Sequence, residues 1–200
     1  MFAQQPHRMT DEEFFAWEEK TRPERHELLD GIAVPRRLRA MSGGTVGHSL
    51  FSTNIAAAVR QKLPPGPSRA HGSNLKIRTP AGSIRYPDAA VDCGALDLKS
   101  YIASEPTVVF EVLSPSNRPG QLLVLLADYQ SIPSLAHIVF LEQTEPAGVI
   151  YSRGESGWVS NTFRGWDTML ELTAIQVRLP LIEVYEDLLA ISPELSDRSE

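Results

Sequence analysis

Cysteine is almost absent from this sequence of 200 residues, which has Cys93 and no other cysteine. One thiol cannot form an internal disulfide, and no His and Cys residues cluster at the spacing of a zinc finger. A chain of this length buries enough apolar surface to fold without either kind of cross-link. The shortage of cysteine therefore indicates a reducing compartment, and we expect a cytoplasmic protein.

Long apolar runs are also missing. The most apolar stretch, residues 122–126, is far shorter than the roughly 20 residues that a transmembrane helix needs. The N-terminal segment has neither an apolar core nor a small-residue cleavage pattern, which argues against a signal peptide. No repeat and no linker divides the sequence. We therefore expect no membrane association and one domain over residues 1–200, with its core at about 9–187.

An excess of positive charge, which nucleic-acid-binding proteins usually carry, is lacking, because the formal net charge is −6 at pH 7. A net charge does not exclude a local basic patch. Basic residues gather at 36–39 and at the positions Arg69, Lys76, Arg78 and Arg85. They either form a patch for DNA or, as is more common, lie on a solvated strand face.

The apolar pattern predicts helices and strands in mixed order. Thr10 and Glu13 form a capping box that starts a helix, and the prolines at 64–67 end another. Helices are expected at 11–20, 46–63, 119–130 and 180–189, and strands at 25–30, 32–40, 75–78, 88–92, 107–113, 137–142, 148–152, 157–164 and 168–172. This order is typical of an α/β (α+β) fold with a central mixed sheet.

Three expected strands carry acidic residues among apolar neighbours, namely Asp88, Glu111 and Glu27. A carboxylate in an apolar strand is costly to desolvate and persists when a metal, a base or hydrogen bonds compensate for burial. Two carboxylates and a backbone carbonyl suit Mg²⁺, and a metal-bound water can attack a phosphodiester. Taken singly, an aspartate after proline is more often a strand-entry residue, and a lone strand glutamate more often lies in solvent.

Several motifs, in the same order, resemble the Uma-two family of endonucleases in the PD-(D/E)XK, or restriction-endonuclease-like, superfamily. They are residues 86–88 (YPD), 110–117 (FEVLSPSN), 129–135 (YQSIPSL), 9–14 (MTDEEF), 27–31 (ELLDG), the helix with His48, and the hairpin with 157–158 (GW). The similarity runs from about residue 9 to residue 187. It implies a central mixed sheet flanked by helices, with extra strands after the nuclease core.

The resemblance also implies a site. Position by position, Asp88 and Glu111 match the metal-binding acids, and the backbone carbonyl of Val112 is the third contact with Mg²⁺ or Mn²⁺. Glu27 and His48 match residues near the pocket, although a packing or surface role is equally common for such a histidine. The implied reaction is hydrolysis of a DNA phosphodiester bond. Many nucleases with such a sheet are homodimers, so a homodimer is a further expectation.

The sequence departs from the superfamily at the lysine that assists catalysis, where it has Leu113. The Uma-two family has its lysine in the next helix, at the position that here is Leu125, and often an acid where this chain has Gln121. An ammonium near the attacking water lowers the pKa of that water, and losing such a group costs roughly 3–4 kcal/mol. Lys76 is a candidate substitute, and an exposed strand lysine is the more common alternative.

Three interpretations stay open: a Mg²⁺-dependent endonuclease, an inactive module that binds DNA or regulates, and a structural protein whose acids are satisfied inside the sheet. Asp88 and Glu111 favour the first two, whereas Leu125 and the acidic net charge favour the last two. A metal site requires the strands with the two acids to lie side by side, with the two carboxylates on one face of the sheet and within roughly 4–6 Å of each other. Residues four apart share one face of a helix, so we also expect Gln121, Leu125 and Tyr129 to point the same way.

Overall fold

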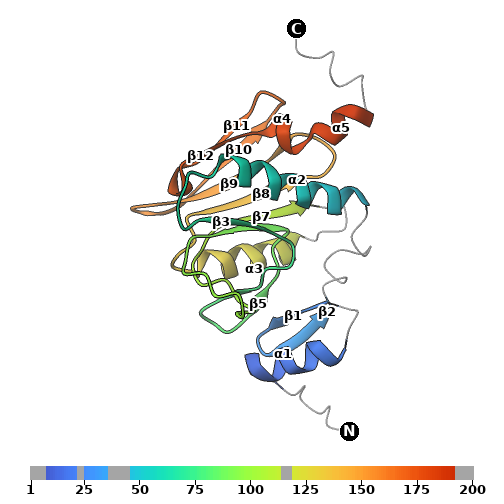
Figure 1. Cartoon of the computed structure of the whole chain (residues 1–200), viewed down its shortest axis with the longest axis vertical. Coiled ribbons are helices and arrows are strands. Elements are labelled where there is room, and N and C mark those ends of the chain that lie inside the picture. Colours follow the sequence, from blue (N-terminus) through green and yellow to red (C-terminus); the bar gives the residue numbers. More distant parts are fainter. Residues whose placement is uncertain (1–7, 22–24, 36–45, 114–118, 192–200) are drawn as a thin grey trace.

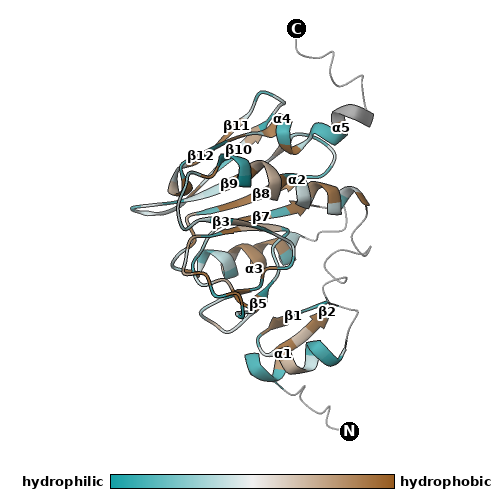
Figure 2. Ribbon diagram, viewed as in Figure 1, coloured by the Kyte–Doolittle hydropathy of each residue, from teal (hydrophilic) through white to brown (hydrophobic). Residues whose placement is uncertain are grey.

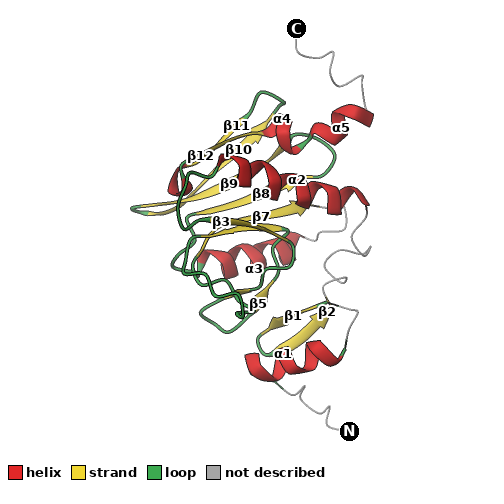
Figure 3. Cartoon of the chain, in the orientation of Figure 1, coloured by secondary structure: helices red, strands yellow, loops and turns green. Residues whose placement is uncertain are grey.

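The computed structural model describes residues 8–21, 25–35, 46–113 and 119–191 (Figure 1). The elements are α1 (Asp11–Lys20), β1 (His26–Leu29), β2 (Ile32–Pro35), α2 (Val46–Lys62), β3 (Arg69–Gly72), β4 (Ile77–Arg78), β5 (Ile84–Arg85), β6 (Ala89–Asp92), β7 (Pro106–Leu113), α3 (Pro119–Gln130), β8 (His137–Glu142), β9 (Ala147–Gly154), β10 (Gly157–Arg164), β11 (Met169–Leu172), the 3₁₀ turn η2 (Thr173–Ile175), β12 (Val177–Pro180), α4 (Leu181–Val184) and α5 (Glu186–Ile191). The mixed order confirms the predicted α/β class (Figure 3).

A six-stranded mixed sheet in the order β10-β9-β8-β7-β6-β3 forms the centre of the molecule. Strands β7 and β8 are parallel, and the other neighbours are antiparallel. Parallel neighbours need a crossover, and α3 supplies it. The central strands are largely apolar because the sheet is covered on both faces, and they are mostly brown in Figure 2.

The two faces of this sheet have separate cores. Helix α2 packs on one face, where Ile55 and Val59 meet Val108 and Phe110 of β7. Helix α3 covers the other face, where Leu125 and Tyr129 form a cluster with Val109 and its neighbours on β8. Strand β7 therefore sends alternate side chains to α2 and to α3, as the two-residue period of a strand requires.

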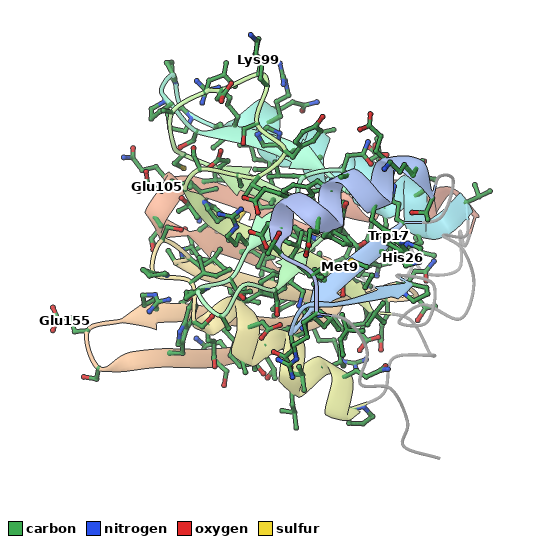
Figure 4. All side chains as sticks on the ribbon, turned by 90° about the horizontal axis from the view of Figure 1, so that it is seen from below. Met9, Trp17, His26, Lys99, Glu105 and Glu155 are labelled. Carbon is green, nitrogen blue, oxygen red and sulfur yellow. The ribbon has the colours of Figure 1, made fainter. Side chains whose placement is uncertain are left out.

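A smaller sheet, β2-β1-β5-β4, lies beside α1 at the lower end of the molecule in Figure 1. The capping box at the start of α1 is confirmed, since Thr10 and Glu13 exchange both hydrogen bonds. The tight turn at Asp30 and Gly31, where both residues have positive φ, joins β1 to β2. Trp17 and His26 pack edge to face between α1 and β1, 4.6 Å between ring centroids (Figure 4).

Most predicted elements are present, with α1, α3, β8 and β10 at the bounds predicted. The sequence does not predict β3, β5 and β12, which are short and carry polar residues, so they show little apolar alternation. The predicted strand at 75–78 is only β4, with a single bridge at Lys76 before it. The last predicted helix is two helices, α4 and α5. Residues 36–40 of the predicted second strand lie outside the described residues.

Among the described segments, no helix combines the length and apolar character needed to cross a membrane.

Candidate functional site

Asp88 immediately precedes β6 and Glu111 lies in β7, so the two acids flank the last residue pair at one end of the β6–β7 ladder. Ala89 pairs with Phe110, so Asp88 precedes the last paired residue on one strand and Glu111 follows its partner on the other. The backbone N–H of Asp88 donates to the Phe110 carbonyl at 3.0 Å. The prediction that these two strands lie side by side is therefore confirmed, with Asp88 just before β6. The close approach of the two carboxylates stays a prediction.

Asp88 is only 3% exposed, and it is contacted by strand β7 and by helix α2. Its Oδ2 accepts a hydrogen bond from the backbone N–H of Val112 at 2.8 Å and lies 3.2 Å from Nε2 of His48. The Asp88 carbonyl accepts a hydrogen bond from the Ser52 hydroxyl. His48 and Ser52 are four residues apart on α2, so one face of that helix contacts Asp88 twice.

Glu111 points toward α3. Its neighbours Val109 and Leu113 pack with the cluster on the α3 side, and alternation places Glu111 on that face too. The Tyr129 hydroxyl donates to Oε1 of Glu111 at 2.5 Å. Leu125, one turn before Tyr129, is buried in the same cluster. The shared face is confirmed for Leu125 and Tyr129, where Leu125 packs as an apolar core residue, and for Gln121 it stays a prediction.

Glu27, the third acid, takes part in a buried ion-pair network. Nη1 of Arg85 lies 2.9 Å from Oε2 of Glu27, and both side chains are 2% exposed. Nε of Arg85 donates to Oδ2 of Asp128 on α3 at 2.7 Å, and Nη2 contacts the same oxygen. The backbone N–H of Tyr86 also donates to Glu27 at 3.5 Å. The structure thus joins β1, β5 and α3 through one guanidinium.

Lys76 is neither an exposed strand lysine nor part of a basic patch. Its Nζ lies 2.8 Å from Oε2 of Glu18 on α1, and the lysine side chain is 12% exposed. The same ammonium lies over the rings of Phe15, Tyr86 and Tyr101, 4.7–5.5 Å from their centroids. The alternation of apolar and charged residues at 75–78 predicts an exposed lysine, and this prediction is wrong because aromatic rings surround the Lys76 side chain. A catalytic role for Lys76 stays a prediction.

The basic cluster predicted as a DNA patch or a solvated face is, in its described part, mostly paired within the fold. Arg78 forms an ion pair with Asp11. Nη1 of Arg69 donates to the carbonyls of Pro67 and Gly94, at 2.6 and 3.2 Å. Arg85 is buried, as described above. The basic residues at 36–39 lie outside the described residues.

The donor set can be tested for a metal. Within the described ranges, no three His, Cys, Asp or Glu side chains are grouped so that they could hold an ion. A cation at Asp88 and Glu111 therefore needs a ligand of another kind, such as a backbone carbonyl or water. Two carboxylates and a carbonyl form a hard-oxygen set, which fits Mg²⁺ or Mn²⁺ better than zinc.

The mixed sheet and its flanking helices are those of a restriction-endonuclease-like fold. Residues 11–181 match the Uma2 family, described as "Putative restriction endonuclease". The chain belongs to the Uma2 family, which confirms the resemblance and supports a nuclease-like function. It is also 29% identical over 188 residues to "Uncharacterized protein slr1290" of Synechocystis sp., an alignment that covers 90% of this chain and 93% of that protein.

Sequence reasoning missed two groups that the structure connects with the predicted residues. Arg85 is taken above for a surface cation, and Asp128 is not singled out. One signal was available, because Arg85 lies between apolar Ile84 and Tyr86, two residues before the proline-aspartate pair. A lone cation in such a segment needs a buried anion. The identity of that anion is not visible in the sequence.

Proposed function

We propose that this protein is a nuclease that uses Mg²⁺ or Mn²⁺ to hydrolyse DNA phosphodiester bonds. The observation that carries the proposal is that the backbones of Asp88 and Glu111 lie side by side at the end of the β6–β7 ladder in a member of the Uma2 family. Both acids are fixed by hydrogen bonds, so their carboxylates are oriented before a cation binds. The dimer, the cytoplasmic location and the one-domain organisation stay predictions.

The cation would be held by Asp88, Glu111 and the backbone carbonyl of Val112. The N–H and C=O groups of a strand residue point to the same neighbouring strand. Because the Val112 N–H donates to Asp88, the carbonyl of Val112 also points to the Asp88 side of β7. When bound, a divalent cation lowers the pKa of its water and neutralises charge on the phosphate.

His48 and the α2 helix orient Asp88. The imidazole Nε2 lies 3.2 Å from the carboxylate, and the His48 side chain is 20% exposed, so it is accessible from solvent. The Ser52 hydroxyl holds the backbone of the same aspartate. We assign His48 to the site as a hydrogen-bond donor to Asp88. Its loss would leave the carboxylate less well oriented and the site weaker for a cation.

The missing lysine makes the proposed enzyme slow. Leu113 is half-buried and Leu125 is buried, and neither can supply charge to the reaction. Lys76 already neutralises Glu18, so its ammonium is committed to a contact within the fold. These observations favour a second candidate, a module that binds DNA through the same fold without turnover. The two candidates differ in whether DNA is cut.

A plasmid-nicking assay with Mg²⁺ and with Mn²⁺ tests the proposal. We expect slow nicking by the unmodified protein and none by Asp88→Asn or Glu111→Gln. Asp92→Asn, a control at the far end of β6, should keep the activity. Equal nicking by all variants would show that another site or a contaminant cuts the DNA.

Two further arms separate the alternatives. Lys76→Ala should abolish nicking at an unchanged melting temperature if this lysine supplies the missing charge. DNA binding in a gel-shift assay, without nicking under either metal, would replace the enzyme with the binding module.

A further inference from the structure

The last turn of α3 contacts three separate parts of the fold within a few residues. We propose that this turn positions Glu111: Tyr129 orients its carboxylate, and the buried Arg85, held by Glu27 and Asp128, fixes the turn. This inference rests on the proposed function, in which Glu111 binds a cation. It gives a positioning role to Glu27, which the family resemblance places near the pocket.

The contact between Tyr129 and Glu111 is the first step. The hydroxyl donates to Oε1 at 2.5 Å, a distance typical of a hydrogen bond to a charged oxygen. The Tyr129 side chain is fully buried and packs with Leu125 in the α3-side cluster. Because the ring is packed, its hydroxyl has a defined position. Glu111 is only half-buried, so this hydrogen bond restricts a carboxylate that packing alone leaves freer.

Arg85 acts on the residue next to Tyr129. Its planar guanidinium donates to Asp128 through Nε and Nη2 and to Glu27 through Nη1. A rigid fork with partners on two sides fixes both carboxylates in direction as well as in distance. Asp128 is therefore held at one place relative to β5, and Tyr129 follows it directly in the helix. The carboxylate of Glu27 keeps the buried guanidinium in this orientation.

Strand β9 fixes the same end of α3 from another direction. Arg153 donates to the carbonyls of Gln130, Ile132 and Leu135 at 2.7–3.1 Å. Its guanidinium also lies 4.5 Å from the ring of Trp158, whose Nε1 donates to Gln130. A basic side chain at the last carbonyls of a helix satisfies groups that the helix itself cannot. The turn that carries Tyr129 is thus held from β5 and from β9.

The alternative is that these contacts only stabilise the fold. The two possibilities differ in one measurable respect. A contact that only stabilises the fold changes the melting temperature of the metal-free protein and leaves the affinity for the cation unchanged, whereas a positioning contact changes the affinity for the cation. Variants that remove one hydroxyl or one charge, and keep the side-chain volume, separate the two effects.

The first experiment measures Mn²⁺ binding by titration calorimetry and by electron paramagnetic resonance. Tyr129→Phe should weaken binding about tenfold, the lower end for partners of metal ligands. Tyr151→Phe is the matched control, because Tyr151 packs against the same cluster from β9, with its ring edge-on to Phe140. Both variants should melt at similar temperatures without metal. Equal Mn²⁺ affinity in Tyr129→Phe and the unmodified protein would overturn the positioning role.

The second experiment asks whether Asp128 acts through Tyr129. Asp128→Asn keeps an acceptor for Arg85 and removes a charge, and it should weaken Mn²⁺ binding by less than tenfold. The double variant with Tyr129→Phe should bind no more weakly than Tyr129→Phe alone, because both changes affect one contact. Additive losses would overturn the link between the two residues. An unmodified protein that binds no Mn²⁺ would overturn the proposed function, and this inference with it.

Discussion

Buried and half-buried acids in two regions of this molecule are compensated in different ways. In the smaller sheet and α1, Glu27 and Glu18 each contact a basic side chain at 2.8–2.9 Å. At the end of the central sheet, Asp88 and Glu111 receive a backbone N–H, an imidazole and a phenol hydroxyl. A carboxylate paired with a cation is neutralised within the fold. Hydrogen bonds from such donors orient a carboxylate and leave it suited to a bound cation, and the proposed metal site is therefore at the second region.

Removal of the buried cation should have the largest effect. Arg85→Met leaves Glu27 and Asp128 without their partner, and breaking a buried pair costs about 3–5 kcal/mol. Arg178→Met is the matched control, because the Arg178–Glu171 pair is largely exposed and a pair of that kind contributes about 0–1 kcal/mol. Urea unfolding gives both free energies. Equal losses would show that the buried network is no more important than a surface pair.

A divalent metal should stabilise the protein by binding at the second region, at Asp88 and Glu111. A ligand present at 100 times its Kd raises the free energy of unfolding by about 2.7 kcal/mol, because it binds only the folded site. Mg²⁺ or Mn²⁺ should therefore raise the melting temperature of the unmodified protein. Asp88→Ala and Glu111→Ala should remove the rise, and Asp92→Asn should keep it. A rise that persists in the alanine variants would place the metal elsewhere.

A lysine at position 125 should increase activity. Leu125 lies one turn before Tyr129 on the face that covers Glu111, so a longer, charged side chain there can reach toward the site. We expect Leu125→Lys to raise metal-dependent nicking at least tenfold, about 1.4 kcal/mol of barrier. Leu123→Lys, on the exposed face of α3, is the control. The idea fails if both lysines give the same rate.

The smallest effect concerns a buried histidine at the far end of β8. Burial lowers the pKa of His137, and its Nε2 faces the backbone N–H of Ala174 at 3.3 Å, so the neutral ring is the form that fits. A lowered pKa means that the unfolded chain takes up the proton first as the pH falls below 6.5. Stability should therefore be complete above that pH and decline below it.

The slope of the free energy of unfolding against pH measures this effect. One proton gives at most about 1.4 kcal/mol per pH unit. His137→Gln should flatten the decline of unfolding free energy between pH 7 and pH 5, and a part should remain because burial also lowers the pKa of His71. An unchanged slope in the variant would assign the pH dependence to other groups.

Local sequence patterns predicted much of the fold. The capping box at Thr10, the apolar runs around Glu111 and the helix at 119–130 are features of contiguous residues, and each appears in the structure. Short polar strands such as β3 have no such pattern, because an edge strand of four residues buries little apolar surface. Sequence reasoning therefore performed best where burial imposes a periodicity.

The sequence by itself determined the family, the mixed α/β class and two strands, β6 directly after Asp88 and β7 with Glu111. Only the tertiary structure decided the partners of the buried charges: Glu27 and Asp128 for Arg85, and Glu18 for Lys76. Arg85 lies 58 and 43 residues from its two partners along the chain. The energy of a buried charge depends on which groups lie within a few ångströms of it, and no local pattern of residues records that distance.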